Sequence, residues 1–220
     1  MYDTIKDRLK NSNWNFLQLS NTSTAPVSIE SLHALYEQHK EIFQRDAFNV
    51  QSTTDQIQNL DELFKHFLNE SSPHTESHSL WRINRMTPAR LLRKLVPSVR
   101  LPVNAAIGIE RYVAIDLGTQ SYALPTTDCS NMFIYQAKGE RTIVLRPTAE
   151  CIQQCRTISV RLKENVFCEY FEEFSPATRQ LTDSNYDSLA VFYDWWYWKP
   201  ISVADPHAKS MSISFIGSYC

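Results

Sequence analysis

Glycine is scarce in this chain: four of the 220 residues are glycine, against ten prolines. The turns must therefore depend on Asn, Asp, Ser and Pro. An excess of charge of either sign is also missing, because 22 basic and 24 acidic residues leave a net charge of −2. No basic surface for nucleic acid is therefore expected. A hydrophobic content of 43% excludes the disordered class of chains.

Long apolar runs are missing as well. The opening sequence, MYDTIKDRLKNSNWNF, carries charges where a signal peptide needs an apolar run. No stretch approaches the roughly 20 apolar residues that span a bilayer. We therefore expect a cytoplasmic protein without membrane contact.

The cysteines are odd in number and include no Cys-x-x-Cys pair. In a cytoplasmic protein they are expected to be reduced thiols. Two of them are four residues apart, which puts them on one face of a helix and leaves a metal or redox pair as the alternative. The five are Cys129, Cys151, Cys155, Cys168 and Cys220.

Helical periodicity dominates the first part of the chain, after a short expected strand at 14–19. Ser28 is a plausible N-cap for a helix carrying Leu32, Leu35, Tyr36 and Ile42. A full capping box is not expected, because Ser31 occupies the position of the usual acid. A second helix is predicted at 61–68. We expect one domain over residues 1–220, with a helical N-terminal portion (1–76) and a β core (77–217).

A polar segment, 69–79, separates the two portions and is predicted to be a surface loop because it contains Pro73. Its His74 and His78 would suit a metal if they were helical. Strand-like runs follow, interrupted by one short helix at 88–96. Strands without long helices between them predict an antiparallel sandwich or barrel. The runs are SLWRIN, RYVAID, MFIYQA, RTIVLRP, VFCEYF, LAVFYDWWYW and SMSISFIG.

Apolar and polar residues alternate most clearly in the last of these runs. Met211, Ile213 and Phe215 share one face of the expected strand, and Ser212 and Ser214 share the other.

Three segments occur in an order that resembles the cupin-like, JmjC-type Fe(II)/2-oxoglutarate hydroxylases, notably the asparaginyl hydroxylase branch. The first segment is 126–141, followed by TIVLRP, the second is 186–197, and the third is SMSISFIG. The resemblance covers roughly residues 77–217. It implies a mainly β fold with N-terminal helices, in which the core is a double-stranded β-helix (a cupin or jelly-roll barrel).

The family's iron triad, His-x-Asp and a distant His, corresponds here to Thr126, Asp128 and Tyr197. Only the carboxylate remains. A neutral hydroxyl and a phenol whose pKa is near 10 are poor Fe(II) ligands. We therefore expect neither Fe(II) nor 2-oxoglutarate as a cofactor. An active oxygenase, or another enzyme with rearranged metal ligands, is the alternative.

The resemblance also implies an anion-binding residue. Arg141 stands where the family places the basic residue that pairs with the far carboxylate of 2-oxoglutarate, whereas Ala123 replaces a hydroxyl that helps to hold it. Asn131 matches a family Asn near the site, and Trp196 and Tyr197 belong to a dense aromatic run. Asp128 is the expected internal partner of Arg141. The expected function is therefore binding of a small carboxylate ligand or a protein partner, and a homodimer or an assembly role is compatible with the sequence.

Overall fold

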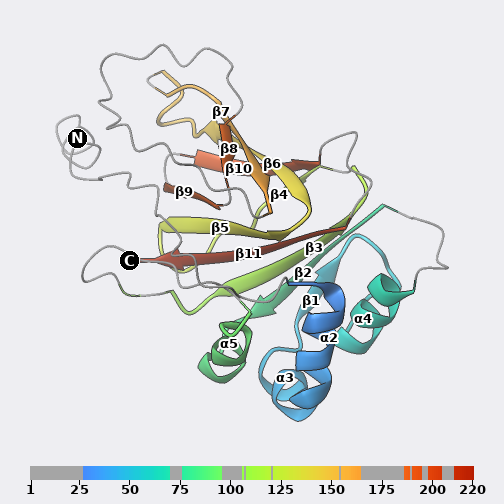
Figure 1. Cartoon of the computed structure of the whole chain (residues 1–220). Coiled ribbons are helices and arrows are strands. Elements are labelled where there is room, and N and C mark those ends of the chain that lie inside the picture. Colours follow the sequence, from blue (N-terminus) through green and yellow to red (C-terminus); the bar gives the residue numbers. More distant parts are fainter. Residues whose placement is uncertain are drawn as a thin grey trace.

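The computed structural model describes residues 27–69, 76–95, 106, 108–119, 121–153, 155–164, 186–188, 190–194, 198–204 and 211–220. Figure 1 shows two facing β-sheets, with the helices gathered against one of them. The described chain is thus mainly β with N-terminal helices, as the sequence predicted. None of the described helices is long and apolar enough to cross a bilayer.

The larger sheet has six strands in the order β1-β2-β3-β11-β5-β9, and all its pairs are antiparallel. Three of its strands, β2, β3 and β11, are almost entirely buried, including their serines. The six strands are Val50–Ser52, Ser77–Ile83, Arg111–Leu117, Ser212–Tyr219, Asn131–Lys138 and Ala190–Asp194.

The smaller sheet has five strands in the order β4-β10-β6-β7-β8. Its pairs are antiparallel except for β7 and β8, which run parallel. The five strands are Tyr122–Ala123, Trp198–Ala204, Glu140–Pro147, Ile158–Lys163 and Tyr186–Ser188.

Five of the seven predicted runs fall largely on single strands, and a sixth is divided. The run at 189–198 contains β9 and the start of β10, with 195–197 outside the described residues. The run VFCEYF and the strand expected at 14–19 also lie outside them. Sequence reasoning missed β1, β4, β7 and β8, three of which have only two or three residues and so show no periodicity.

Four helices are described: α2 (Ile29–Gln38), α3 (Lys40–Asp46), α4 (Leu60–Leu68) and α5 (Met86–Leu92). Ser28 is the N-cap of α2, as predicted. The expectation of an incomplete capping box was wrong. The Ser31 hydroxyl accepts a hydrogen bond from the Ser28 backbone N–H at 2.9 Å, while the Ser28 hydroxyl accepts one from the Ser31 N–H at 3.2 Å. A serine hydroxyl therefore replaces the usual acid.

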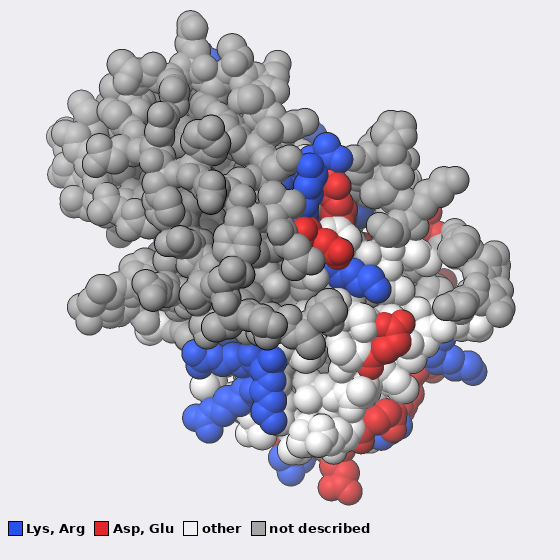
Figure 2. All heavy atoms as spheres, viewed as in Figure 1, with Lys and Arg blue, Asp and Glu red and all other residues white. Residues whose placement is uncertain are grey.

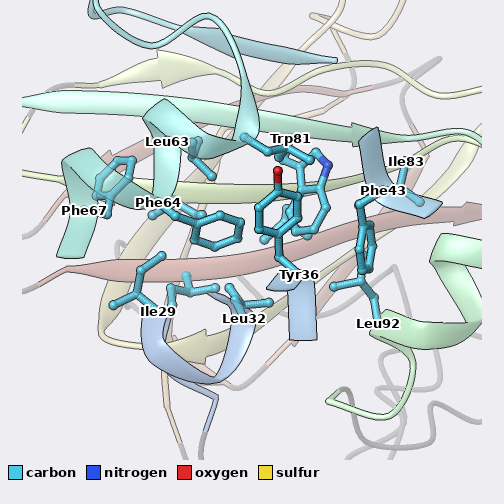
Figure 3. Packing of buried hydrophobic residues seen from close by; sticks show 14 of the residues in the cluster. Ile29, Leu32, Tyr36, Phe43, Leu63, Phe64, Phe67, Trp81, Ile83 and Leu92 are labelled. Atoms are coloured by element: carbon cyan, nitrogen blue, oxygen red, sulfur yellow. The ribbon is translucent and has the colours of Figure 1, made fainter. Parts of the chain in front are cut away.

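One apolar core lies between the helices and the outer face of the six-stranded sheet. Figure 3 shows Tyr36, Phe43 and Phe64 packed around Trp81, which is fully buried. The Trp81 indole also donates a hydrogen bond to the Ala47 carbonyl at 2.7 Å, so its polar atom is satisfied. Burying each such side chain contributes about 1.5–3 kcal/mol. This packing confirms that the N-terminal helices cover an outer face of the β core.

A second core fills the space between the two sheets and includes Met132, Ile134, Ile143 and Leu162. On β11 the predicted alternation is present: Ile213 and Phe215 belong to the helix-side core. The serines of the opposite face are nevertheless buried too, at 2% exposure for Ser212 and 4% for Ser214. Because helices cover one face and a second sheet covers the other, both faces of this strand are enclosed.

Gly139 carries the chain from the larger sheet to the smaller one. It is the single residue between β5 and β6, and its φ of 70° lies in the left-handed region that glycine adopts without strain. A Cβ here would stand 2.5 Å from the Met211 carbonyl oxygen. This sharp corner places Arg141 at the start of β6.

Two corrections concern the cysteines and the polar segment. Cys129 and Cys220 form a disulfide, with Cα atoms 5.2 Å apart, and Cys151 is bonded to Cys155, so these four are not reduced thiols. The predicted loop 69–79 was wrong at its end, because β2 begins at Ser77. Residues 70–75, with His74, lie outside the described residues.

Candidate functional site

Five polar side chains from both sheets meet between them, at the end where β5 passes into β6. The larger sheet supplies His78 from β2 and Asp116 from β3, which are direct neighbours in the β2–β3 register. The smaller sheet supplies Tyr122 from β4, Arg141 from β6 and Ser202 from β10, and Tyr122 and Ser202 are direct neighbours in the β4–β10 register. We call these five residues the polar cluster. It is assembled by strand pairing between segments far apart in the chain.

The Asp116 carboxylate is the centre of the polar cluster. Its Oδ1 lies 2.5 Å from Nδ1 of His78, and its Oδ2 accepts a hydrogen bond from the Tyr122 hydroxyl at 2.6 Å. Nε of Arg141 lies 4.0 Å from the same Oδ2 and donates a hydrogen bond to the Ser202 hydroxyl at 2.9 Å. One carboxylate therefore has a ring nitrogen, a phenol and a guanidinium around it.

Tyr122 packs between the two basic side chains. The His78 ring stacks on it with ring centroids 3.3 Å apart and an interplanar angle of 19°. Cζ of Arg141 lies 5.1 Å from the centre of the same ring, which is cation–π geometry. The phenol thus holds the two basic groups in fixed positions relative to Asp116.

Three members are removed from water: Asp116 and Arg141 are each 2% exposed, and His78 is 7% exposed. Burial raises the pKa of Tyr122 well above its ordinary value, and the Asp116 charge raises it further, while Arg141 acts in the opposite direction. The phenol therefore stays protonated and acts as a hydrogen-bond donor. Buried charges are costly unless they are paired, so each member depends on the others.

A second polar group continues from the polar cluster along the larger sheet. Ser212 of β11 is the direct neighbour of Asp116 in the sheet. Its hydroxyl accepts a hydrogen bond from Nε2 of Gln136 at 2.8 Å, and the Ser214 hydroxyl donates to Oε1 of Gln136 at 2.8 Å. Gln136 is fully buried. Polar groups therefore occupy much of the space between the sheets at this end.

Arg141 lies where the sequence placed it, on an inner face, but the prediction of its partner was wrong. The neighbouring carboxylate belongs to Asp116, not to Asp128. Asp128 precedes β5 and Arg141 follows it. Eight strand residues separate the ends of β5 by about 26 Å.

Asp128 has different neighbours at the far end of the sheet. Its carboxylate accepts hydrogen bonds from the backbone N–H groups of Ile109 at 2.7 Å and Glu110 at 3.3 Å, and from the Ser218 hydroxyl at 3.3 Å. Thr126 is exposed nearby in the chain. Asn131, the first residue of β5, pairs with Tyr219 at this same end, away from Arg141.

This donor set does not fit iron. Where the hydroxylases that the sequence resembles have His-x-Asp, this chain has a neutral threonine hydroxyl and a carboxylate already bonded to three donors. Trp196 and Tyr197, the remaining predicted site residues, lie outside the described residues. Among the residues that the structure describes, no three His, Cys, Asp or Glu side chains are grouped so as to hold a metal ion.

Sequence reasoning missed Asp116, Tyr122 and Ser202 as site residues, and it considered His78 only as a metal ligand on a helix, whereas His78 lies on strand β2. A signal was present in two of them. Asp116 ends the apolar run RYVAID, and His78 stands two residues before the apolar LWRI, so each is a titratable group in a strand that is otherwise buried. Ser202 and Tyr122 gave no such signal, because hydroxyl residues are common on strands.

No family model and no curated protein matches the chain.

Proposed function

We propose that this chain is a cupin-like protein that lacks the family's iron site and binds a small carboxylate ligand through Arg141. The observation that carries the proposal is the position of this guanidinium: it is buried on the inner face of β6, lies over the Tyr122 ring and donates to the Ser202 hydroxyl. A desolvated guanidinium with neighbouring donors is a strong and directional carboxylate receptor.

The strand order supports the proposed double-stranded β-helix. Eight strands are counted from β3 to β11, with the short β8 left out. In the larger sheet, the first, eighth, third and sixth of them lie side by side as β3, β11, β5 and β9. In the smaller sheet, the second, seventh, fourth and fifth lie side by side as β4, β10, β6 and β7. The chain changes sheet at every connection of this set except the one between β6 and β7. Such repeated crossing is characteristic of jelly-roll folds, which include the cupins.

The residues at the family's iron positions support a role without iron. Asp128 is bonded to two backbone N–H groups and a serine hydroxyl, so its lone pairs already have donors. The polar cluster, by contrast, contains a buried guanidinium, which is a carboxylate-binding group, beside one carboxylate, Asp116, with which a bound acid would share Arg141. The proposal is therefore ligand binding, not turnover.

Thermal melting with diacids tests this proposal. We expect 2-oxoglutarate or succinate to raise the melting temperature of the wild type in a saturable way, and dimethyl succinate, which is uncharged, to leave it unchanged. A ligand at 100 times its Kd stabilises a protein by about 2.7 kcal/mol. Arg141→Gln should abolish this shift. Arg146→Gln, which removes an exposed arginine from the same strand, should retain it.

Arg141→Gln also removes a charge next to Asp116, so its unliganded melting temperature should fall. For that reason each variant's ligand shift is measured against its own unliganded value, and Arg141→Lys provides a variant that keeps the charge. A wild type that no diacid stabilises would contradict the proposal and leave the polar cluster a structural ion pair. Turnover of 2-oxoglutarate with Fe(II) and ascorbate, together with bound iron by elemental analysis, would favour the alternative of an active oxygenase.

A further inference from the structure

A long stretch of the chain is basic without any acid, although the whole chain is slightly acidic. From Arg82 to Ile109 the sequence contains six Lys or Arg residues and no Asp or Glu. This stretch contains α5 and the residues on either side of it. The even overall charge balance therefore conceals a local excess of positive charge.

The structure places four of these cations on and beside α5. Pro88 and Leu92 of α5 are buried, so the apolar side of the helix packs into the helix-side core. The charged side is exposed. Figure 2 shows the basic side chains gathered over α5, at the lower left of the view. The exposed cations in and around α5 are Arg85, Arg90, Arg93 and Lys94.

These four cations have no carboxylate within salt-bridge distance in the part of the chain that the structure describes. Asp46 pairs with Arg45 at 2.9 Å, although the charge of Arg85 also contributes to lowering its pKa, and Glu110 pairs with Arg82. Burial lowers the pKa of Arg111, and the positive charge of Arg93 lowers it further, whereas the negative charge of Asp128 acts in the opposite direction.

Two large apolar side chains are exposed beside the cations. Met86, the first residue of α5, is 52% exposed, and Phe48 is 57% exposed. The Arg82 N–H donates to the Asn49 carbonyl at 2.9 Å, so the chain at Phe48 runs alongside the segment that enters α5. Aromatic residues, Met and Arg are the types enriched in protein–protein interfaces.

We propose that the face formed by Phe48, Arg85, Met86, Arg90, Arg93 and Lys94, here called the basic face, binds an acidic peptide segment of another protein. The carboxylates of that segment meet the arginines, and its apolar side chains contact Phe48 and Met86. This surface is independent of the polar cluster and of any ligand there.

Other anionic partners fit the basic face less well. A helix that binds a membrane surface inserts an apolar face, but α5 already buries Pro88 and Leu92 in the core. Nucleic acid favours domains with a strongly basic balance, whereas this chain carries −2. Exposed Phe and Met side chains add contacts that a protein partner uses and that a phosphate backbone does not.

The test uses the full chain and three fluorescent or sedimentable probes. The first is a short fluorescein-labelled peptide of Glu and Asp interspersed with Leu and Phe, measured by fluorescence anisotropy. The second is a vesicle of phosphatidylcholine and phosphatidylserine, and the third is a short DNA duplex. We expect the peptide to bind best, and a peptide of Glu and Asp alone to bind more weakly because Phe48 and Met86 then lack a partner.

Two matched double variants assign the binding to this face. Arg90→Glu/Arg93→Glu should lower the peptide affinity by about tenfold or more. Lys65→Glu/Arg156→Glu, which reverses two exposed cations elsewhere and changes the net charge equally, should retain the wild-type affinity. Phe48→Ser/Met86→Ser should weaken the Leu- and Phe-containing peptide only. All the substituted residues are exposed, so circular dichroism melting should show each variant folded.

Three outcomes would overturn the proposal. The first is no peptide binding by the wild type at low salt. The second is an equal loss in both charge-reversed variants, which would make the attraction a general effect of net charge. The third is stronger binding to the vesicle or to the duplex than to the peptide, which would assign the basic face to lipid or to nucleic acid.

Discussion

At the scale of single residues, Asp116 is the buried carboxylate around which the polar cluster is arranged. Its carboxylate contacts His78, Tyr122 and Arg141, all on different strands. A buried carboxylate is tolerated only because these neighbours supply donors and positive charge. The same carboxylate connects the two sheets, because β3 belongs to one sheet while β4 and β6 belong to the other.

The Tyr122 hydroxyl gives this cluster a measurable dependence on alkaline pH. Burial raises the pKa of Tyr122 in the folded protein, whereas in the unfolded chain it is near 10. A group whose folded pKa is raised contributes stability that is present below the unfolded pKa and is lost as pH rises through the folded pKa. The contribution of Tyr122 is therefore full at neutral pH and declines above about pH 10.

We predict that Tyr122→Phe lowers the free energy of unfolding by about 1.5–3 kcal/mol near neutral pH, because a hydrogen bond to a charged acceptor is lost. Urea titrations at a series of pH values measure this. The difference from the wild type should shrink above pH 10. Tyr112→Phe is the matched control, because the Tyr112 hydroxyl has no carboxylate partner within the described structure. A difference that is constant across pH would contradict the raised pKa.

At the scale of elements, α2 shows how two small hydroxyls can begin a helix. Ser28 and Ser31 exchange hydrogen bonds with each other's backbone N–H groups, at 3.2 and 2.9 Å. The helix is only ten residues long, so its ends matter more than its intrinsic propensity. Its buried side chains, Ile29, Leu32 and Tyr36, then fix it against the sheet.

A double-mutant cycle checks that the two hydroxyls act as a pair. Ser28→Ala should cost about 1 kcal/mol of stability, the usual loss for an N-cap residue. Ser31→Ala should cost less, because its hydroxyl satisfies one N–H that water can otherwise reach. The double variant should lose less than the sum of the two. Strict additivity in chemical denaturation would contradict the reciprocal arrangement.

At the scale of the whole molecule, the disulfide between Cys129 and Cys220 joins the segment before β5 to the end of β11. The two cysteines are 91 residues apart, so the bond closes a long loop in the unfolded chain. The loop-entropy model gives about 4–5 kcal/mol for a loop of this length. For Cys151 and Cys155, four residues apart, it gives only about 2 kcal/mol.

We therefore predict that Cys129→Ser/Cys220→Ser destabilises the fold clearly more than Cys151→Ser/Cys155→Ser does. Thermal melting with and without dithiothreitol measures both. The reductant breaks both disulfides, so it should lower the melting temperature of the wild type by more than the first double substitution does. It should lower that of the first double variant by the smaller amount expected for the bond between Cys151 and Cys155. A wild type that is unaffected by reductant would show that these thiols are reduced in the purified protein.

The sequence by itself determined the class of the fold, because strand runs such as RYVAID and RTIVLRP contain enough alternating or continuous apolar residues to specify buried strands. It also placed the α2 N-cap, because that depends on local spacing, whereas the position of Arg141 on an inner face was implied by the family resemblance. Strands of two or three residues are too short to show a regular spacing, so β1, β4 and β8 were not predicted.

Only the tertiary structure decided which groups meet. Asp116, not Asp128, lies beside Arg141, and Cys129 meets Cys220, because strand order brings together residues that no local pattern connects. Tertiary packing also decided where the basic face lies. The whole-chain charge of −2 conceals it, and it becomes a surface only because α5 turns its apolar side to the core and leaves its arginines outside.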